Sequence, residues 1–387
     1  MRLDTIQALR GLAAYLVLFY HIAAMERSAI AALGTDESPL VGGIFRNGYA
    51  GVDLFFVISG FIMVYVTAKR PENLATVRDF FLARLYRILP PWWLFAGIMA
   101  FYLYLTYGVP WDAEALERTG NTGLNYIIRS FLLLPQPNFP VLGVGWTLVH
   151  EMYFYVGFAL ILLFPRRFLP LLLLLWGGAV VIGASFGLTN VYANDFVGLA
   201  FYLMTLEFIA GALVGWAFVK GFRPFPGIAF LLGLVSFLVV LAVLPPYVPN
   251  LLTWGRVAAF TLPCALMVYG AAGLQARLGH GWVARTMTRL GDWSFALYLS
   301  HMIVLSGLRK GLPLLAGILE RRFGLSPEAT GFLRLGTEGY LDNVFYILVA
   351  VILSTMAAAF AFYAFERPVL RMFNALRQRR TDLVKAW

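Results

Sequence analysis

Long apolar stretches alternate with short polar segments along the whole chain. Each stretch has roughly the 20 residues that an α-helix needs to cross the hydrocarbon core of a bilayer. Ten of them occur, at 6–25, 48–67, 88–107, 144–164, 168–187, 198–219, 226–244, 254–273, 290–308 and 343–365. They are too long and too apolar for barrel strands, and lipid leaves no unpaired backbone groups. The pattern predicts an all-α polytopic membrane protein, a single domain over 1–387 built as a bundle of about ten transmembrane helices.

Composition supports this class. Hydrophobic residues make up 60% of the 387 and charged residues only 13%, with a mean hydropathy of +0.77. A soluble domain has nearer a quarter of its residues charged.

The only cysteine, Cys264, lies in the eighth stretch and can form neither an intrachain disulfide nor a cysteine-rich metal site. No metal is expected. No cleavage site of the small-x-small type follows the first stretch, so we expect it to be retained.

The basic residues indicate the orientation. An even number of spans puts both termini on one side, and 20 of the 30 Lys and Arg residues fall on that side. The positive-inside rule then predicts cytoplasmic termini, with 370–387 as a basic cytoplasmic tail. The net charge of +10 reflects orientation and contact with anionic membrane lipids rather than with nucleic acid. Two outer segments, 108–143 and 309–342, are long enough to be lids, or simply solvated connectors.

Several ionisable residues lie within the apolar stretches, where they are unfavourable and mark candidate functional sites. At about 100° and 1.5 Å per residue, His21 lies within roughly 20° of the face of Arg10 and about 16 Å further along the helix. Asp53, His150 and Glu151 come out near the depth of His21, in the outer half of the bundle. Such a group suggests a general base oriented by an acid. The alternative is a hydrogen-bond network that only holds the helices together.

Arginines gather at the inner surface. Arg84 and Arg87 are three residues apart, so they share a helix face and can converge on one anion. Guanidinium groups suit phosphate, although a basic flank to a membrane span is an alternative. With Arg10 also at this level and His21 about 16 Å outward, a ligand with a phosphate head and a long thin arm would bridge the two sites. Coenzyme A has this shape.

Six motifs spread over residues 10–369 carry a family resemblance. Together they resemble the acyltransferase-3 family of bacterial integral-membrane O-acyltransferases, in particular its exopolysaccharide-production branch. One departure is "DTIQALRG" before the first arginine, where the family often has Asp-Gly. The motifs are Arg10–x10–His21, "GVDLFFVISGF" at 51–61, "RLYR" at 84–87, "GWTLVHEMYFY" at 145–155, "SFALYLSH" at 294–301 and "FERPV" at 365–369.

The resemblance implies a reaction and its partners. The donor would be acetyl-CoA, used as a co-substrate from the cytoplasm. The acceptor would be a hydroxyl of an exopolysaccharide, another cell-surface glycan or a lipid-linked sugar precursor. The protein would lie in the bacterial inner membrane, alongside polysaccharide-assembly machinery. By family pattern Arg10 pairs functionally with His21, Arg84 with Arg87, and Glu151 takes the family's acidic position.

We therefore expect a catalytic group and a donor site. His21 would act as general base or as transient nucleophile, with Glu151 or Asp53 orienting it. The donor phosphates would lie on the arginines at positions 10, 84 and 87.

An acceptor site is expected at the outer ends of the helices. Trp146, Tyr153 and Tyr155 would stack on sugar rings, although aromatic residues near an interface also form membrane belts. His150 and His301 complete the predicted acceptor site. Two other functions stay open: a proton-coupled transporter of a sugar or lipid-linked glycan, and a scaffold for polysaccharide assembly. Stable binding of acetyl-CoA would separate the enzyme from both.

Overall fold

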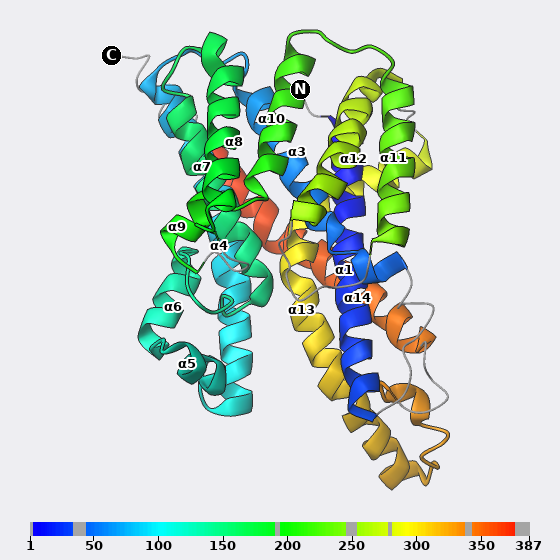
Figure 1. Ribbon diagram of the computed structural model, residues 1–387. Coiled ribbons are helices and arrows are strands. Elements are labelled where there is room, and N and C mark those ends of the chain that lie inside the picture. Colours follow the sequence, from blue (N-terminus) through cyan, green and yellow to red (C-terminus); the bar gives the residue numbers. More distant parts are fainter. Residues whose placement is uncertain are drawn as a thin grey trace.

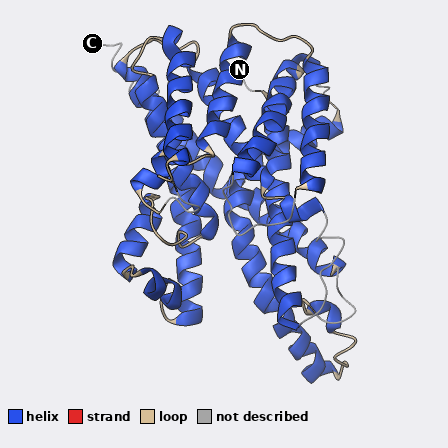
Figure 2. Ribbon diagram, in the orientation of Figure 1, coloured by secondary structure: helices blue, strands red, loops and turns tan. Residues whose placement is uncertain are grey.

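The computed structural model describes residues 3–33, 44–189, 194–244, 254–277, 281–336 and 343–375. Every regular element within these ranges is helical (Figure 2). Ten helical segments are long and apolar enough to cross a membrane. The prediction of an all-α, polytopic bundle is confirmed.

The ten predicted stretches coincide with ten helical segments, and the differences lie at their ends. The helices are α1 (Asp4–Leu33), α3 (Ala50–Thr67), α4 (Leu74–Tyr107), α7 (Trp146–Ile161), α8 (Leu169–Ser185), α10 (Thr205–Val219), α11 (Pro226–Val243), α12 (Trp254–Gly273), α13 (Trp282–Phe323) and α14 (Val344–Ala361). The largest differences are in α4, which begins at Leu74 rather than at 88, and α13, which extends well beyond 290–308. Hydropathy detects only the lipid-length part of a helix. The start of α4 is set instead by Asn73, whose side chain accepts a hydrogen bond from Thr76 N at 2.9 Å.

Helix α3 lies at the centre of the bundle. It packs against α1, α10 and α12, while α1 also runs beside α13 and α11 pairs with α12 (Figure 1). The contact of α3 with α10 is close because a glycine lies at the crossing: a Cβ at Gly60 would lie 1.9 Å from the carbonyl oxygen of Phe208. Small residues at crossings let helices approach closely in lipid, where dispersion contacts rather than hydrophobic burial drive association.

The segment 108–143, predicted from the sequence to be on the outer side, contacts the bundle through α4. It contains α5 (Ala113–Thr119) and α6 (Gly123–Leu132). The indoles of Trp92 and Trp93 on α4 donate to the carbonyl oxygens of Ser130 and Phe131, each at 3.0 Å. This segment is therefore attached to α4 through the end of α6, while only Leu116 of α5 is buried.

The second segment predicted to be on the outer side, 309–342, begins as the continuation of α13. After α13 ends at Phe323, Arg334 forms an ion pair with Glu320 at 2.6 Å. Residues 337–342 lie outside the described ranges. So does most of the predicted basic tail, of which only 370–375 are described, as helix.

Candidate active site

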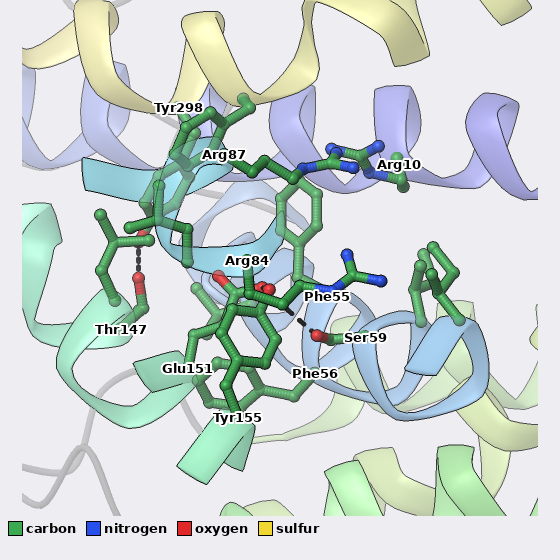
Figure 3. A pocket seen from close by; sticks show the side chains of 16 residues that line it. Arg10, Phe55, Phe56, Ser59, Arg84, Arg87, Thr147, Glu151, Tyr155 and Tyr298 are labelled. Carbon is green, nitrogen blue, oxygen red and sulfur yellow. Dashed lines mark hydrogen bonds between the residues drawn. The ribbon is translucent and has the colours of Figure 1, made fainter. Parts of the chain in front are cut away.

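A cavity of about 80 Å³ lies inside the bundle, where α1, α3, α4, α7 and α13 meet (Figure 3). Its lining combines charged and hydroxyl side chains with apolar ones from α3. The residues come from opposite ends of the chain, so only the folded bundle assembles them. The polar lining residues are Arg10, Ser59, Arg84, Arg87, Thr147, Glu151, Tyr155 and Tyr298.

The cavity is strongly basic. Three guanidinium groups and one carboxylate line it. Those of Arg10 and Arg87 are close enough to repel each other (Figure 3). The guanidinium of Arg84 lies 5.6 Å from the ring centroid of Tyr155, and its Nε is buried with no hydrogen-bond partner among the described residues. Since like charges in a buried site are unfavourable unless something neutralises them, the lining favours an anion. Planar guanidinium forks match phosphate.

Glu151 is held by two hydroxyl groups. The phenol of Tyr155, one turn further along α7, donates a short hydrogen bond to Oε1 of Glu151, and Ser59 Oγ donates to the same atom at 3.3 Å. Glu151 also interacts electrostatically with Arg84 and Arg10. The structure thus brings Glu151 together with the arginines. The hydrogen bonds of its carboxylate go to hydroxyls rather than to a histidine.

Asp53 lies in a separate ion pair. Arg256 on α12 donates to it from Nε (3.0 Å to Oδ1) and from Nη2 (2.7 Å to Oδ2). The Asp53 side chain is 0% exposed and that of Arg256 is 4% exposed. Glu207 on α10, also buried, interacts electrostatically with both. Asp53 therefore ties α3 to α10 and α12.

His21 meets His301. Nδ1 of His21 lies 2.9 Å from the carbonyl oxygen of Val17 and 3.2 Å from Nε2 of His301, and the two ring centroids are 5.0 Å apart. The ring of His301 lies 6.0 Å from that of Tyr298, which lines the cavity and bonds Thr147 at 2.8 Å. The histidine pair is thus the next layer beyond the cavity wall.

The other three predicted acceptor residues lie outside the cavity lining. His150 packs its ring 3.9 Å from that of Tyr202, and its Nδ1 lies 2.8 Å from the carbonyl oxygen of Trp146. Tyr153 donates to the carbonyl oxygen of Ala200 at 3.0 Å and so links α7 to α9 (Phe196–Ala200). Four residues were predicted to lie together because they lie at a similar depth in the bundle. In the structure each of them has different neighbours: His21, Asp53, His150 and Glu151.

Sequence reasoning missed Glu366. It lies in η6 (Phe362–Glu366), a π-helical turn that follows α14, and its side chain is 5% exposed. Its carboxylate interacts electrostatically with Arg87 and Arg10. π-turns are rare and often occur at functional sites. The signal in the sequence is the glutamate of "FERPV", a motif whose spacing alone indicates no role for this residue.

Comparison with known proteins identifies the family of the chain. The family model for the acyltransferase domain Acyl_transf_3 matches residues 3–364. The chain belongs to the acyltransferase-3 family. It is therefore a multi-pass membrane acyltransferase, and its reaction requires an acyl donor.

Two relatives of this acyltransferase align over most of their length. It is 31% identical over 348 residues to exopolysaccharide production protein ExoZ of Rhizobium meliloti (strain 1021), covering 87% of this chain and 94% of ExoZ. It is 27% identical over 361 residues to acyltransferase MdmB of Streptomyces mycarofaciens, covering 87% and 86%. No solved structure matches the chain. Within the described ranges, no group of three or more His, Cys, Asp or Glu side chains could hold a metal ion.

Proposed function

We propose that this acyltransferase moves an acetyl group from cytoplasmic acetyl-CoA to a hydroxyl of an exopolysaccharide, another cell-surface glycan or a lipid-linked precursor. The likeness to ExoZ supports a glycan acceptor. We further propose that the protein lies in the bacterial inner membrane with both termini in the cytoplasm. The excess of Lys and Arg on the side of the termini supports this orientation.

One observation carries the proposal: a cavity inside the bundle, lined by three arginines, lies beside the contact of His21 with His301, and Arg10 and His21 are on the same helix, α1. Arg10, Arg84 and Arg87 would hold the phosphates of the donor, and its pantetheine arm would run along α1. The eleven residues from Arg10 to His21 correspond to about 16 Å of helix, which an extended arm can span. Glu151 and Glu366 would partly offset the positive charge of the arginines when the donor is absent.

The chemistry assigned to His21 is proton transfer. His21 takes the proton of the acceptor hydroxyl while the hydroxyl oxygen attacks the thioester carbonyl. The carbon–sulfur bond then breaks, and coenzyme A leaves as a thiolate that recovers the proton from His21. The products are an O-acetyl ester and free coenzyme A. In the alternative, His21 first accepts the acetyl group itself and passes it to the hydroxyl. Trp146, His150 and Tyr153 would contact the sugar from the outer side.

Sealed membrane vesicles of the native host test this proposal. Acetyl-CoA labelled in the acetyl group is added to inside-out vesicles, whose cytoplasmic face is exposed. We expect base-labile label in the glycan fraction, and none above background with His21→Ala. Right-side-out vesicles should incorporate no label. Equal labelling of vesicles with and without the protein would contradict the proposal. Glycan uptake driven by a proton gradient, without acetylation, would favour the transporter.

A further inference from the structure

We propose that His301 is the positioning residue of the transfer reaction: its Nε2 accepts a hydrogen bond from Nδ1–H of His21. This leaves Nε2 of His21 as the reacting nitrogen. The inference rests on the proposed function for its catalytic consequence. The hydrogen bond itself can be tested without any donor.

The donor and acceptor roles follow from the neighbours of each ring nitrogen. Nδ1 of His301 lies 2.9 Å from the carbonyl oxygen of Leu297, and Nδ1 of His21 lies 2.9 Å from that of Val17. A carbonyl oxygen only accepts, so both Nδ1 atoms carry hydrogen. In a neutral ring the other nitrogen is then bare. Nε2 of His301, 3.2 Å from Nδ1 of His21, is therefore an acceptor for the same N–H that bonds Val17.

The same argument leaves Nε2 of His21 without a hydrogen, so that this nitrogen is available to accept a proton. Among the described residues, both hydrogen-bond contacts of the His21 ring involve Nδ1. His21 itself is only partly buried, while His301 is 1% exposed. The ring of His21 thus has one nitrogen turned to a buried acceptor and one lone pair available for a substrate.

Helix packing holds the two rings in this relation. A Cβ on Gly291 would lie 1.9 Å from the carbonyl oxygen of Gln7, and one on Gly11 would lie 3.0 Å from Gly291 N. Ten residues further along each helix, His21 meets His301. Helices α1 and α13 therefore run parallel and in register from the glycine contact to the histidine contact, about 15 Å at 1.5 Å per residue. The glycines bring the backbones close enough for the rings to meet.

The chemical consequence appears when His21 becomes charged. When Nε2 of His21 takes the hydroxyl proton, the ring becomes an imidazolium and Nδ1–H becomes a stronger donor. His301 keeps its own proton on Nδ1. Its Nε2 accepts the stronger hydrogen bond, and the protonation of His301 does not change. When Nε2 passes the proton to the thiolate, the original state returns. An acyl group on Nε2 would create the same positive charge, so the role of His301 is common to both mechanisms.

Nitrogen NMR tests the hydrogen bond directly. The full-length protein, labelled with ¹⁵N-histidine, contains four histidines. We expect a scalar coupling across the hydrogen bond between Nδ1 of His21 and Nε2 of His301, observed without acetyl-CoA and absent in His301→Gln. A wild-type protein in which the two nitrogens show no coupling would overturn the proposal.

Kinetics test the consequence. His301→Phe keeps a ring of similar volume but removes the acceptor, and we expect kcat to fall roughly 10- to 150-fold, the worth of a hydrogen bond to a charged group. The KM for acetyl-CoA should stay within about twofold, because the donor binds on the arginines. His301→Gln retains an acceptor oxygen and should recover part of kcat. Ser300→Ala, a buried neighbour on the same helix, is the matched control.

The outcomes separate the two proposals. If His301→Phe folds, binds acetyl-CoA and keeps the wild-type kcat, His301 is not a positioning residue. If the coupling is present but the wild-type protein neither binds nor consumes acetyl-CoA, the proposed function fails and the catalytic role of His301 fails with it. The assigned hydrogen bond then remains as a contact between α1 and α13.

Discussion

The ion pair between Asp53 and Arg256 gives a prediction that separates a structural from a catalytic role. Both side chains are buried, and two hydrogen bonds of 3.0 and 2.7 Å join them. The Arg256 guanidinium also lies 4.5 Å from the ring centroid of Tyr49. Removing one partner leaves an uncompensated buried charge, which typically costs about 3–5 kcal/mol. At roughly 2 °C per kcal/mol for a large domain, Arg256→Met should lower the unfolding temperature by roughly 6–10 °C.

The double variant sharpens this test. Asp53→Leu/Arg256→Met removes both charges and fills the space with apolar atoms, so we expect its loss of stability to be smaller than the sum of the single losses by about 2 kcal/mol or more. Unfolding is followed in detergent by size-exclusion chromatography of heated samples. Arg118→Met breaks an exposed pair with Glu114, 3.9 Å apart, and should not shift the unfolding temperature.

Measuring transfer activity together with the unfolding temperature can refute the structural role of Asp53. We expect Asp53→Asn to lower the unfolding temperature and to retain transfer activity per folded molecule at low temperature. If Asp53→Asn unfolds at the wild-type temperature yet abolishes transfer, Asp53 acts in the reaction, as the sequence suggested, and the structural interpretation of this pair is wrong.

Three further predictions concern packing and the cavity. Glu366→Gln removes a carboxylate that offsets two cavity arginines, so we expect a lower unfolding temperature without donor and a larger stabilisation by saturating coenzyme A; equal stabilisation of both proteins would contradict this. Gly291→Ala places a Cβ against the backbone of α1 and should cost about 1–3 kcal/mol, whereas Gly307→Ala, with nothing within 4 Å of the new atom, should be neutral in the same thermal assay. Trp92→Phe removes the indole hydrogen bond to the carbonyl oxygen of Ser130, which keeps the 3.4 Å bond from Leu133 N; it should cost about 0.5–1.5 kcal/mol, more than the same change at Trp93, which is 45% exposed.

The span pattern could be predicted because the requirement of the bilayer is simple. A helix in lipid must be apolar over a fixed length, and the ten stretches satisfy this locally, without reference to their neighbours. Helix ends depend on other interactions, such as the Asn73 cap of α4 and the continuation of α13 beyond the apolar region. A hydropathy profile contains no information about these helix ends.

Helix spacing predicted which residues share a face, whereas depth alone did not predict which residues lie together; the roles of these residues stay predictions. The spacing of Arg84 and Arg87 placed both in one cavity, since residues three apart share a face. Depth gives the position of a residue along the bundle axis but not the direction in which it points. Asp53 therefore points to α12 and His150 to Tyr202, although both were expected with His21.

Two contacts near the site could not have been predicted from the spacing of residues in the sequence. The meeting of His21 with His301 depends on which helices pack together, a property of the whole fold. The placement of Glu366 depends on a π-helical turn that leaves no hydropathy signal.

Calorimetric titration of acetyl-CoA into the detergent-purified protein tests the central claim most directly. We expect the wild-type protein and His21→Ala to bind the donor, and Arg84→Ala/Arg87→Ala to bind it at least roughly tenfold more weakly, because each lost charge-assisted hydrogen bond is worth about 1.5–3 kcal/mol. That result would assign the arginines to donor binding and leave His21 to the chemistry. A folded, monodisperse wild-type protein that shows no binding, or an arginine double variant that binds as tightly as wild type, would contradict the account.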